Sequence, residues 1–377
     1  MNSKKVSMLL IAGLFIFAII SACGGSGKTI KVGLLSSQTG PIAVYAPGFE
    51  AAANVAIDEL NASDDGNTYE LVIADSGCDG TQASTSAQSL IDSGVVGIAG
   101  AACSGATLGA ISVASEAGIP MVSYASTSAA ITNASDNGYL FRVVPSDGQQ
   151  SDALSQIVKD AGHTSPAVLY MTNDYGAGLG ENFIAFYGDV CTSVGYDPAE
   201  GSYDASSLAQ AVVDGNCDSA VLMSYATDGA AIVEALKAQG FSGGIFGGDG
   251  IGDAGFIDEF TDVSAVTGVV ATKPRPGQDS SAKSSFESAY KAAGGDPGGI
   301  YTHSTYDAVT IIAKAASADS DDDLRDDLKS IGTNYDGASG NHTFDSNGDV
   351  LGTGYEVCHF DPDFHCEKIW TQEGGLK

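Results

Sequence analysis

The sequence is poor in positive charge. Lys and Arg together number 16 against 47 Asp and Glu, which gives a formal net charge of −31 at pH 7. A surface this acidic repels the phosphates of nucleic acids and the headgroups of anionic lipids. Only three arginines occur, Arg142, Arg275 and Arg325, so a dicarboxylate clamped between Arg side chains is disfavoured as a ligand. The composition therefore argues against nucleic-acid binding.

Long hydrophobic runs are also scarce. The one uncharged apolar run spans residues 8–20, and it is shorter than the roughly 20 residues that a membrane-spanning helix needs. Lys4 and Lys5 precede this run, an arrangement that is typical of a signal peptide. The sequence therefore predicts export, with residues 1–22 as the signal peptide.

The end of the signal peptide points to a lipid anchor. Ile20-Ser21-Ala22-Cys23 resembles a bacterial lipobox, in which Cys23 becomes the lipidated first residue of the mature protein, and Gly and Ser follow it as a flexible tether. Ordinary cleavage after Ala22 is the alternative. We expect an extracytoplasmic, periplasmic or cell-surface lipoprotein, with residues 23–28 as the lipidated Cys and tether.

The remaining cysteines indicate disulfide bonds. Six are left, at positions 78, 103, 191, 217, 358 and 366, and an even number outside the cytoplasm favours oxidised pairs. Six cysteines allow 15 pairings, and their spacing favours three local bridges: Cys78 with Cys103, Cys191 with Cys217 and Cys358 with Cys366. The alternative is a metal site built from Cys358-His359 and His365-Cys366, which export and the non-standard spacing disfavour. We therefore predict no metal.

Short β-branched runs alternate with helical stretches from Thr29 onward. The runs predicted to be buried parallel strands are 30–35, 69–74, 95–100, 120–124, 167–171, 220–224 and 244–248. The stretches predicted to be helices are 47–62, 81–93, 106–118, 148–162, 176–195, 228–240, 280–295 and 299–318. This βαβ alternation predicts an α/β fold with parallel sheets.

The alternation pauses twice, which suggests a division into two lobes. Segments 141–150 and 270–279 break the pattern with Pro and Gly, and both are expected to cross between lobes. The acidic segment 319–332 and a strand-rich tail follow, and the tail is expected to form hairpin strands and a third crossing. We assign residues 29–146 plus 275–352 to lobe 1 and residues 147–274 plus 353–377 to lobe 2.

Polar side chains follow several of the predicted strands. In open parallel sheets, ligands bind beyond the carboxyl ends of the strands. Segments 101–106 and 125–129 bring Ser and Thr before helices whose free N–H groups favour an anion, whereas 172–178 and 247–253 bring Tyr175 and Asp249. Together these segments could bind a zwitterion, with its carboxylate at the hydroxyl and N–H groups and its ammonium group facing a carboxylate. Each Ser or Thr alone, however, is commonly a helix cap.

At these residues the sequence resembles the branched-chain amino-acid binding protein family, the type I periplasmic solute-binding proteins of ABC importers. The resemblance covers most of the mature chain, and its order and spacing are specific. It is carried by segments 32–62, 97–132, 139–150, 173–179, 247–251, 269–274 and 344–349. It implies two Rossmann-like lobes joined by three hinge crossovers that close on a small ligand. It also implies that Cys78 and Cys103 match the family's cysteine pair beside the site.

The resemblance implies a role for each of several residues. Ser104 resembles the serine that receives the ligand α-carboxylate, and Ala125 and Thr127, with Ser126 between them, resemble the loop that binds both charged groups. Asp249 lies where the family often has an acid for the α-ammonium, and it is shorter than the glutamate of several members. Aromatic positions that wall the side-chain pocket are matched by Tyr45, Tyr175, Tyr225 and Tyr301, for each of which core packing is the alternative.

These implications predict a non-enzymatic binding protein that captures a neutral amino acid and presents its closed form to an ABC permease and ATPase, with no cofactor. A small amide, urea or an organic acid is the alternative ligand, and sensing through a receptor is the alternative use. Hinge motion is expected near 145–149, 271–276 and 351–355.

Two motifs and one missing motif bear on other functions, and none of them supports an alternative. Residues 240–244 match G-x-S-x-G, but a helix precedes and a strand follows, the reverse of a nucleophile elbow. No glycine-rich dinucleotide fingerprint follows the first strand, which argues against an NAD enzyme. Residues 345–356 match part of a calcium loop, but Val350 stands where Gly is required, so a turn at Asn347-Gly348 is favoured.

Overall fold

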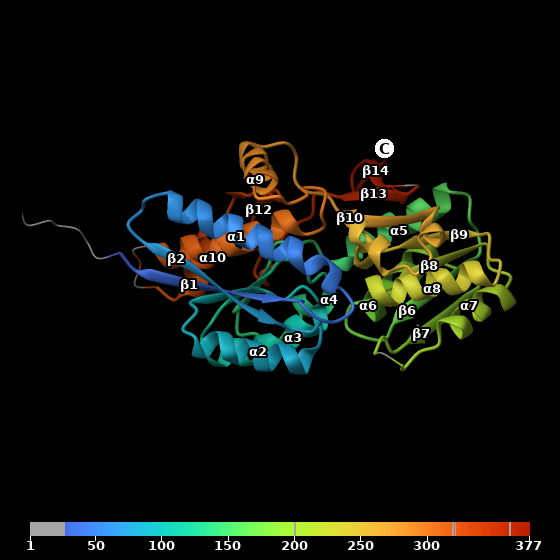
Figure 1. Ribbon diagram of the computed structural model, residues 1–377, viewed down its shortest axis with the longest axis horizontal. Helices are drawn as coiled ribbons and strands as arrows, with labels where there is room; N and C mark the ends of the chain where they lie inside the picture. Colours follow the sequence, from blue (N-terminus) through green and yellow to red (C-terminus); the bar gives the residue numbers. More distant parts are fainter. Residues whose placement is uncertain (1–26, 200, 319, 321, 362) are drawn as a thin grey trace, which may run out of the picture.

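The computed structural model describes residues 27–199, 201–318, 320, 322–361 and 363–377. The chain forms two α/β lobes side by side along the long axis of the molecule (Figure 1). The predicted signal peptide and Cys23 lie outside the described residues. Within the described part of the chain, no helix combines the length and apolarity that crossing a membrane demands.

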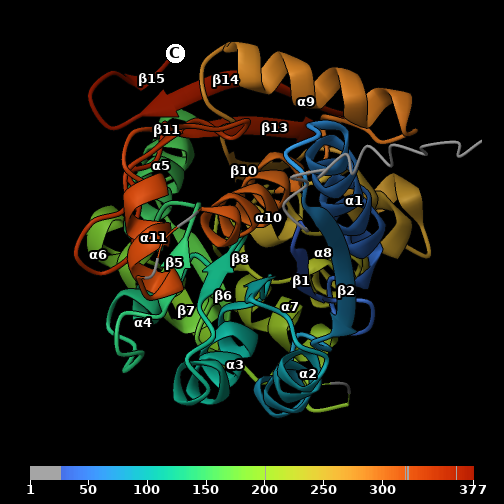
Figure 2. The same ribbon diagram turned by 90° about the vertical axis from the view of Figure 1, so that its left-hand side faces the viewer.

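The first lobe is built on a parallel sheet of five strands in the order β2-β1-β3-β4-β5. These strands are β1 (Thr29–Ser36), β2 (Thr68–Asp75), β3 (Gly97–Gly100), β4 (Met121–Ser123) and β5 (Leu140–Arg142). Helices α1 (Ala46–Ala62) and α10 (Thr302–Ser317) pack together on one face, and α2 (Gly80–Asp92) and α3 (Ser104–Glu116) on the other (Figure 2). Because helices cover both faces, the central strands are buried and apolar.

The second lobe is built on a mixed sheet of eight strands in the order β15-β14-β13-β10-β9-β8-β6-β7. Its parallel part comprises β6 (Pro166–Met171), β7 (Thr192–Tyr196), β8 (Ser219–Met223), β9 (Gly244–Gly247) and β10 (Val269–Pro274). The antiparallel edge comprises β13 (Tyr355–Phe360), β14 (Phe364–Thr371) and β15 (Gly375–Leu376), which confirms the hairpin strands predicted for the tail.

Helices again cover both faces of the second sheet. Helix α5 (Asp147–Asp160) packs on α6 (Gly176–Tyr187), and α7 (Ala205–Asp214) packs on α8 (Ala226–Ala238). The remaining elements are α4 (Ala129–Thr132), α9 (Ser281–Ala292), α11 (Leu324–Ile331), β11 (Tyr335–Asp336), β12 (Asn341–His342) and the 3₁₀ turns η1 (Ala43–Tyr45), η2 (Asp249–Ile251), η3 (Ala254–Glu259) and η4 (Val263–Val266).

Three connections join the lobes. One runs from β5 to α5, one from β10 to α9, and one from β12 to β13, so the chain crosses between the sheets three times. This confirms the fold class predicted from the sequence, two Rossmann-like lobes joined by three crossovers. The residue boundaries assigned to the lobes stay a prediction.

The structure corrects one helix and adds elements that the sequence pattern did not indicate. Segment 176–195 was predicted to be one helix, but α6 ends at Tyr187, Gly188 follows with φ 102°, and β7 begins at Thr192. Glycine tolerates this left-handed conformation, which ends the helix. Strands β5 and β7 and helix α7 were not predicted, and β10 occupies much of the predicted break at 270–279.

Three disulfide bonds are present, and they are the three local pairs that the spacing favoured: Cys78–Cys103, Cys191–Cys217 and Cys358–Cys366. The last bond joins neighbouring strands β13 and β14. Because both sulfurs are consumed in it, they cannot act as thiolate ligands, and the metal alternative at Cys358 and Cys366 is wrong.

Candidate functional site

A cavity lies between the lobes, where the carboxyl ends of the two parallel sheets face each other. It encloses about 350 Å³, part of it open to solvent. Its lining residues come from both lobes: Ile42, Tyr45, Phe49, Ala102, Ser104, Ala125, Tyr175, Tyr225, Asp249, Gly250, Ile300 and Tyr301. Seven of the nine residues expected from the sequence to bind a ligand are in this list.

One side of the cavity offers hydrogen-bond donors. Ser104 is the first residue of α3, where the helix presents free N–H groups that favour an anion. Its Oγ is buried and accepts a hydrogen bond from the amide of Ser128 at 3.3 Å. Ala125 lines the cavity immediately after β4. This side can therefore receive a carboxylate.

The two remaining predicted residues, Ser126 and Thr127, are buried but do not line the cavity. The Ser126 hydroxyl lies 2.7 Å from Thr107 Oγ1 and donates to the carbonyls of Ala101 and Ala102, both at 3.1 Å. These bonds hold the loop after β3 against the loop after β4. The Thr127 hydroxyl, in contrast, has no hydrogen-bond partner among the described residues.

The opposite side of the cavity carries an acidic side chain. Asp249 begins η2 directly after β9 and is only 4% exposed. Its Oδ1 accepts from the Tyr175 hydroxyl at 2.8 Å, and its Oδ2 from the Tyr301 hydroxyl at 2.5 Å. Burial raises the pKa of Asp249, and these two hydrogen bonds act in the opposite direction. The carboxylate is thus held by donors and faces the cavity, as an ammonium partner must.

Four tyrosines line the cavity: Tyr45, Tyr175, Tyr225 and Tyr301. The rings of Tyr175 and Tyr225 stack with centroids 5.1 Å apart and planes within 8°. Burial and the charge of Asp249 raise the pKa of both phenols well above the usual value, so they remain protonated donors. The apolar lining residues Ile42, Phe49 and Ile300 were not predicted from the sequence. Ile42 and Ile300 are single apolar residues outside regular helices and strands, and Phe49 lies within α1, where an apolar residue cannot be told from a core residue.

Hydrogen bonds join the two lobes around the cavity. The Tyr45 hydroxyl donates to the carbonyl of Gly250 at 3.3 Å, and the amide of Thr227 donates to the carbonyl of Pro41 at 3.2 Å. On the other flank, Ser128 Oγ donates to the carbonyl of Asp174 at 2.6 Å. These three hydrogen bonds link residues of the first lobe to residues of the second.

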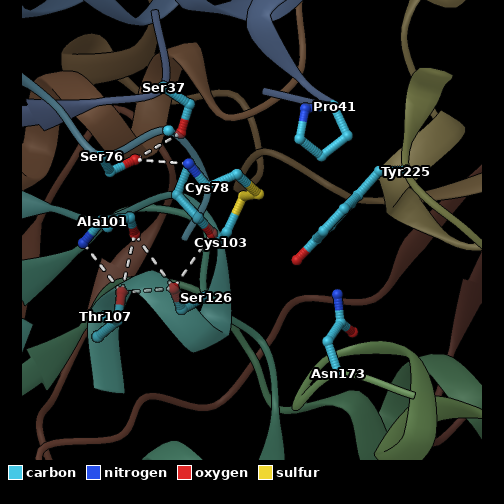
Figure 3. The surroundings of a disulfide bond; sticks show 12 residues. Ser37, Pro41, Ser76, Cys78, Ala101, Cys103, Thr107, Ser126, Asn173 and Tyr225 are labelled. Carbon is cyan, nitrogen blue, oxygen red and sulfur yellow. Dashed lines mark hydrogen bonds between the residues drawn. A yellow bond between two sulfur atoms is a disulfide. The ribbon is translucent and has the colours of Figure 1, made fainter. Parts of the chain in front are cut away.

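The Cys78–Cys103 disulfide lies beside the cavity, with Pro41 and Tyr225 across from it (Figure 3). Cys103 is the N-cap residue of α3, so the bond ties the start of that helix, and Ser104 with it, to the loop after β2. The second bond, Cys191–Cys217, precedes β7 and β8 and therefore lies at the end of its sheet remote from the cavity.

We expect the two bonds to differ in their effect on binding. Replacing either pair with Ser should lower the free energy of unfolding by about 3 kcal/mol, because each bond closes a loop of similar length. Only the C78S/C103S variant should also weaken ligand binding, by about tenfold, since it frees the N-terminus of α3. Calorimetric binding and urea unfolding measure the two quantities. Equal ligand affinities for both double variants would contradict the role given to Cys78–Cys103.

Residues 29–361 match the family model described as periplasmic binding protein. The chain belongs to this family. The matched residues include both lobes and all three crossovers, and they therefore include every residue that lines the cavity. The family is one of solute-binding proteins. The relatives of this chain are binding proteins by name, which confirms the prediction of a non-enzymatic protein.

Curated relatives support the resemblance found in the sequence. The chain is 26% identical over 371 residues to the leucine-, isoleucine-, valine-, threonine-, and alanine-binding protein of Pseudomonas aeruginosa, covering 96% of each chain. It is 25% identical over 346 residues to the Leu/Ile/Val-binding protein of Escherichia coli K12, covering 88% of this chain and 90% of the relative. The predicted resemblance to the branched-chain amino-acid binding proteins is therefore confirmed.

Solved structures share the fold. The leucine binding protein LivK of Thermotoga maritima superimposes with a TM-score of 0.80 at 24% identity, covering 91% of this chain and 99% of that one. The substrate binding protein LivJ of Streptococcus pneumoniae, solved in complex with isoleucine, gives a TM-score of 0.79 at 24% identity, with 90% and 99% covered. Both confirm the two-lobed architecture.

Proposed function

We propose that this protein is the lipid-anchored solute-binding component of an ABC importer and captures a neutral amino acid by closure of its two lobes. One observation carries the proposal. The buried Asp249 carboxylate, held by Tyr175 and Tyr301, stands across a small cavity from Ser104 at the N-terminus of α3. An anionic group and a set of anion-binding donors on opposite sides of one cavity are complementary to a zwitterion.

The walls support a ligand with an uncharged side chain. Ile42, Phe49 and Ile300 are apolar, and none of the described residues that line the cavity is Lys, Arg or His. Leucine, isoleucine, valine, threonine and alanine, named for the relative from Pseudomonas aeruginosa, are all of this kind. The four tyrosine hydroxyls allow a polar side chain as well. The closed form is the one that a permease and its ATPase recognise, and Cys23 keeps it at the membrane.

A thermal-shift screen of residues 24–377 tests the ligand class. A ligand at 100 times its dissociation constant stabilises the folded state by about 2.7 kcal/mol, which raises the melting temperature by several degrees. We expect neutral amino acids to produce this shift, whereas small amides, urea and simple carboxylates produce none. A shift with amides, urea or carboxylates and none with any amino acid would contradict the proposed ligand.

A further inference from the structure

A second cavity lies among the three connections between the lobes, next to the cavity described above. It encloses about 590 Å³, part of it open to solvent. Each connection contributes to its lining, through residues 143–145, 273–276 and 350–354. Residues around the start of α10 and in the hairpin of β11 and β12 complete the lining. This space is named the hinge cavity.

The lining of the hinge cavity is basic. None of the 21 described residues that line it is Asp or Glu, although 47 of the 377 residues of the chain are acids. Lys273 and Arg275 line it, together with His303 and His342, two of the five histidines of the chain. Burial lowers the pKa of His303, whereas Lys273 and Arg275 stay charged at neutral pH. The cavity between the lobes, in contrast, is lined by Asp249.

The charge of Arg275 is not compensated by the described part of the chain. Its guanidinium makes no ion pair there, unlike those of Arg142 and Arg325. The other cation, Lys273, is buried, and its Nζ lies 3.4 Å from the Oε2 atom of Glu356, which is not a lining residue. Arg275 is half-buried, so water solvates its charge only in part. A cation in this position favours the binding of an anion.

The backbone fixes Arg275 between two of the connections. Its amide donates to the carbonyl of Gly354, and its carbonyl accepts from Thr353 Oγ1, both at 2.9 Å. Gly352 approaches the first connection so closely that a Cβ at this position would lie 2.6 Å from the Cβ of Pro145. The three connections thus pack on one another around the hinge cavity. A change in the angle between the lobes therefore alters the shape of this cavity.

We propose that the hinge cavity binds a tetrahedral oxyanion, phosphate or sulfate, at Arg275 and Lys273, and that this anion strengthens binding of the amino acid between the lobes. A guanidinium binds such an oxyanion through two parallel N–H donors, and a doubly charged anion matches the two cations of the lining. The coupling to the amino acid rests on the proposed function, whereas the anion site itself does not.

The two cavities share a wall, which gives the coupling its route. Ile300 and Tyr301 line both of them, and the Tyr301 hydroxyl donates to Asp249 Oδ2 at 2.5 Å. An anion that fits the hinge cavity in the present arrangement, in which hydrogen bonds join the lobes, stabilises this arrangement over others. The same arrangement forms the cavity for the amino acid. Each ligand therefore raises the affinity for the other by the same factor.

Melting temperatures measured without amino acid test the anion site. Residues 24–377 are titrated with sodium phosphate or sodium sulfate at constant pH, with sodium chloride keeping the ionic strength constant. Both anions also stabilise folded proteins through exclusion from the surface, an effect that grows steadily with concentration, whereas binding to a site saturates. We expect a saturating rise of about 2 °C or more in the wild-type protein, and its loss in the Arg275→Gln variant.

Arg325→Gln is the matched control, because Arg325 lines neither cavity. The R325Q variant should respond to both anions as the wild-type protein does. Arg275→Lys keeps the positive charge but lacks the planar fork, so it should respond only at higher anion concentration. The R275K variant decides the question should R275Q fail to fold.

Calorimetric titration with L-leucine measures the coupling. At an anion concentration that saturates the thermal response, the wild-type protein and R325Q should bind leucine about fivefold more tightly than in chloride of equal ionic strength. The R275Q variant should bind leucine with the same affinity in both salts.

Two results would overturn the proposal. If the melting temperatures of R275Q and R275K respond to the anions as that of the wild-type protein does, the anion does not bind at Arg275. If the leucine affinity is the same with and without a bound anion, the hinge cavity is not coupled to the cavity between the lobes. A wild-type protein that binds the anion but no amino acid would refute the proposed function while confirming the anion site.

Discussion

Replacing Asp249 with Asn is expected to weaken amino-acid binding by about 30- to 100-fold, which corresponds to about 2–3 kcal/mol. The side chain keeps its size and can still accept a hydrogen bond from Tyr175 or Tyr301, but it loses the charge that faces the ligand ammonium. Isothermal titration with L-leucine and L-alanine measures the loss. Burial raises the pKa of Asp249, so the unliganded variant should be no less stable than wild type.

Asp262→Asn is the matched control for this variant. Asp262 lies in the same lobe, is exposed, and caps η4 by accepting from the amide of Ser264. Asn caps helices about as well as Asp, so neither stability nor affinity should change. If D249N binds amino acids as tightly as D262N does, Asp249 is not the ammonium partner.

The second large effect is expected at Arg142, whose guanidinium organises the candidate binding loop from behind. One nitrogen donates to three successive carbonyls, those of Ser126, Thr127 and Ser128, while Nε pairs with Asp349 near the third crossover. Arg142→Met removes a fully buried charge from this network. Breaking a buried ion pair costs about 3–5 kcal/mol. We expect a loss of this size in urea unfolding, together with at least tenfold weaker amino-acid binding.

Arg325→Met provides the comparison. Arg325 is partly exposed, and its charged contacts with Asp323 and Asp326 are 3.9 and 3.8 Å long. Surface pairs of this kind contribute at most about 1 kcal/mol, and Arg325 is not among the residues that line the cavity. R325M should therefore bind amino acids like wild type. An R142M variant as stable as R325M, with unchanged affinity, would show that the network does not shape the site.

The fold was predictable wherever local pattern and burial agree. Helices cover both faces of the sheets, so strands such as 30–35 and 167–171 are apolar throughout. This apolar composition was enough to predict them as buried strands. Strand β5 has three residues and β7 lies at a sheet edge with alternate residues exposed, so neither forms a continuous apolar run. The break predicted at 270–279 does contain prolines at which the regular structure ends. Strand β10, however, extends to Pro274 before the chain crosses to the other lobe.

The cavity was predictable in part. Residues that follow strands, such as Ser104 and Asp249, were found because parallel strands gather their carboxyl ends at one edge. Arg142 was not assigned to the site from sequence, since its importance arises from burial and from contacts with the loop after β4. The identity of a residue in the sequence shows neither its burial nor its contacts. Ser126 shows the converse, because its hydroxyl turns toward backbone carbonyls instead of the cavity.

The proposed cavity recognises both the carboxylate and the ammonium group of a zwitterion. Calorimetric titration of the wild-type protein with L-leucine, 4-methylpentanoate and 3-methylbutylamine tests it most directly, because the three compounds share one side chain and differ only in their charged groups. We predict that leucine binds at least 100-fold more tightly than either analogue. Equal affinity for leucine and one of the analogues would show that the missing charge is not recognised, and would contradict the account.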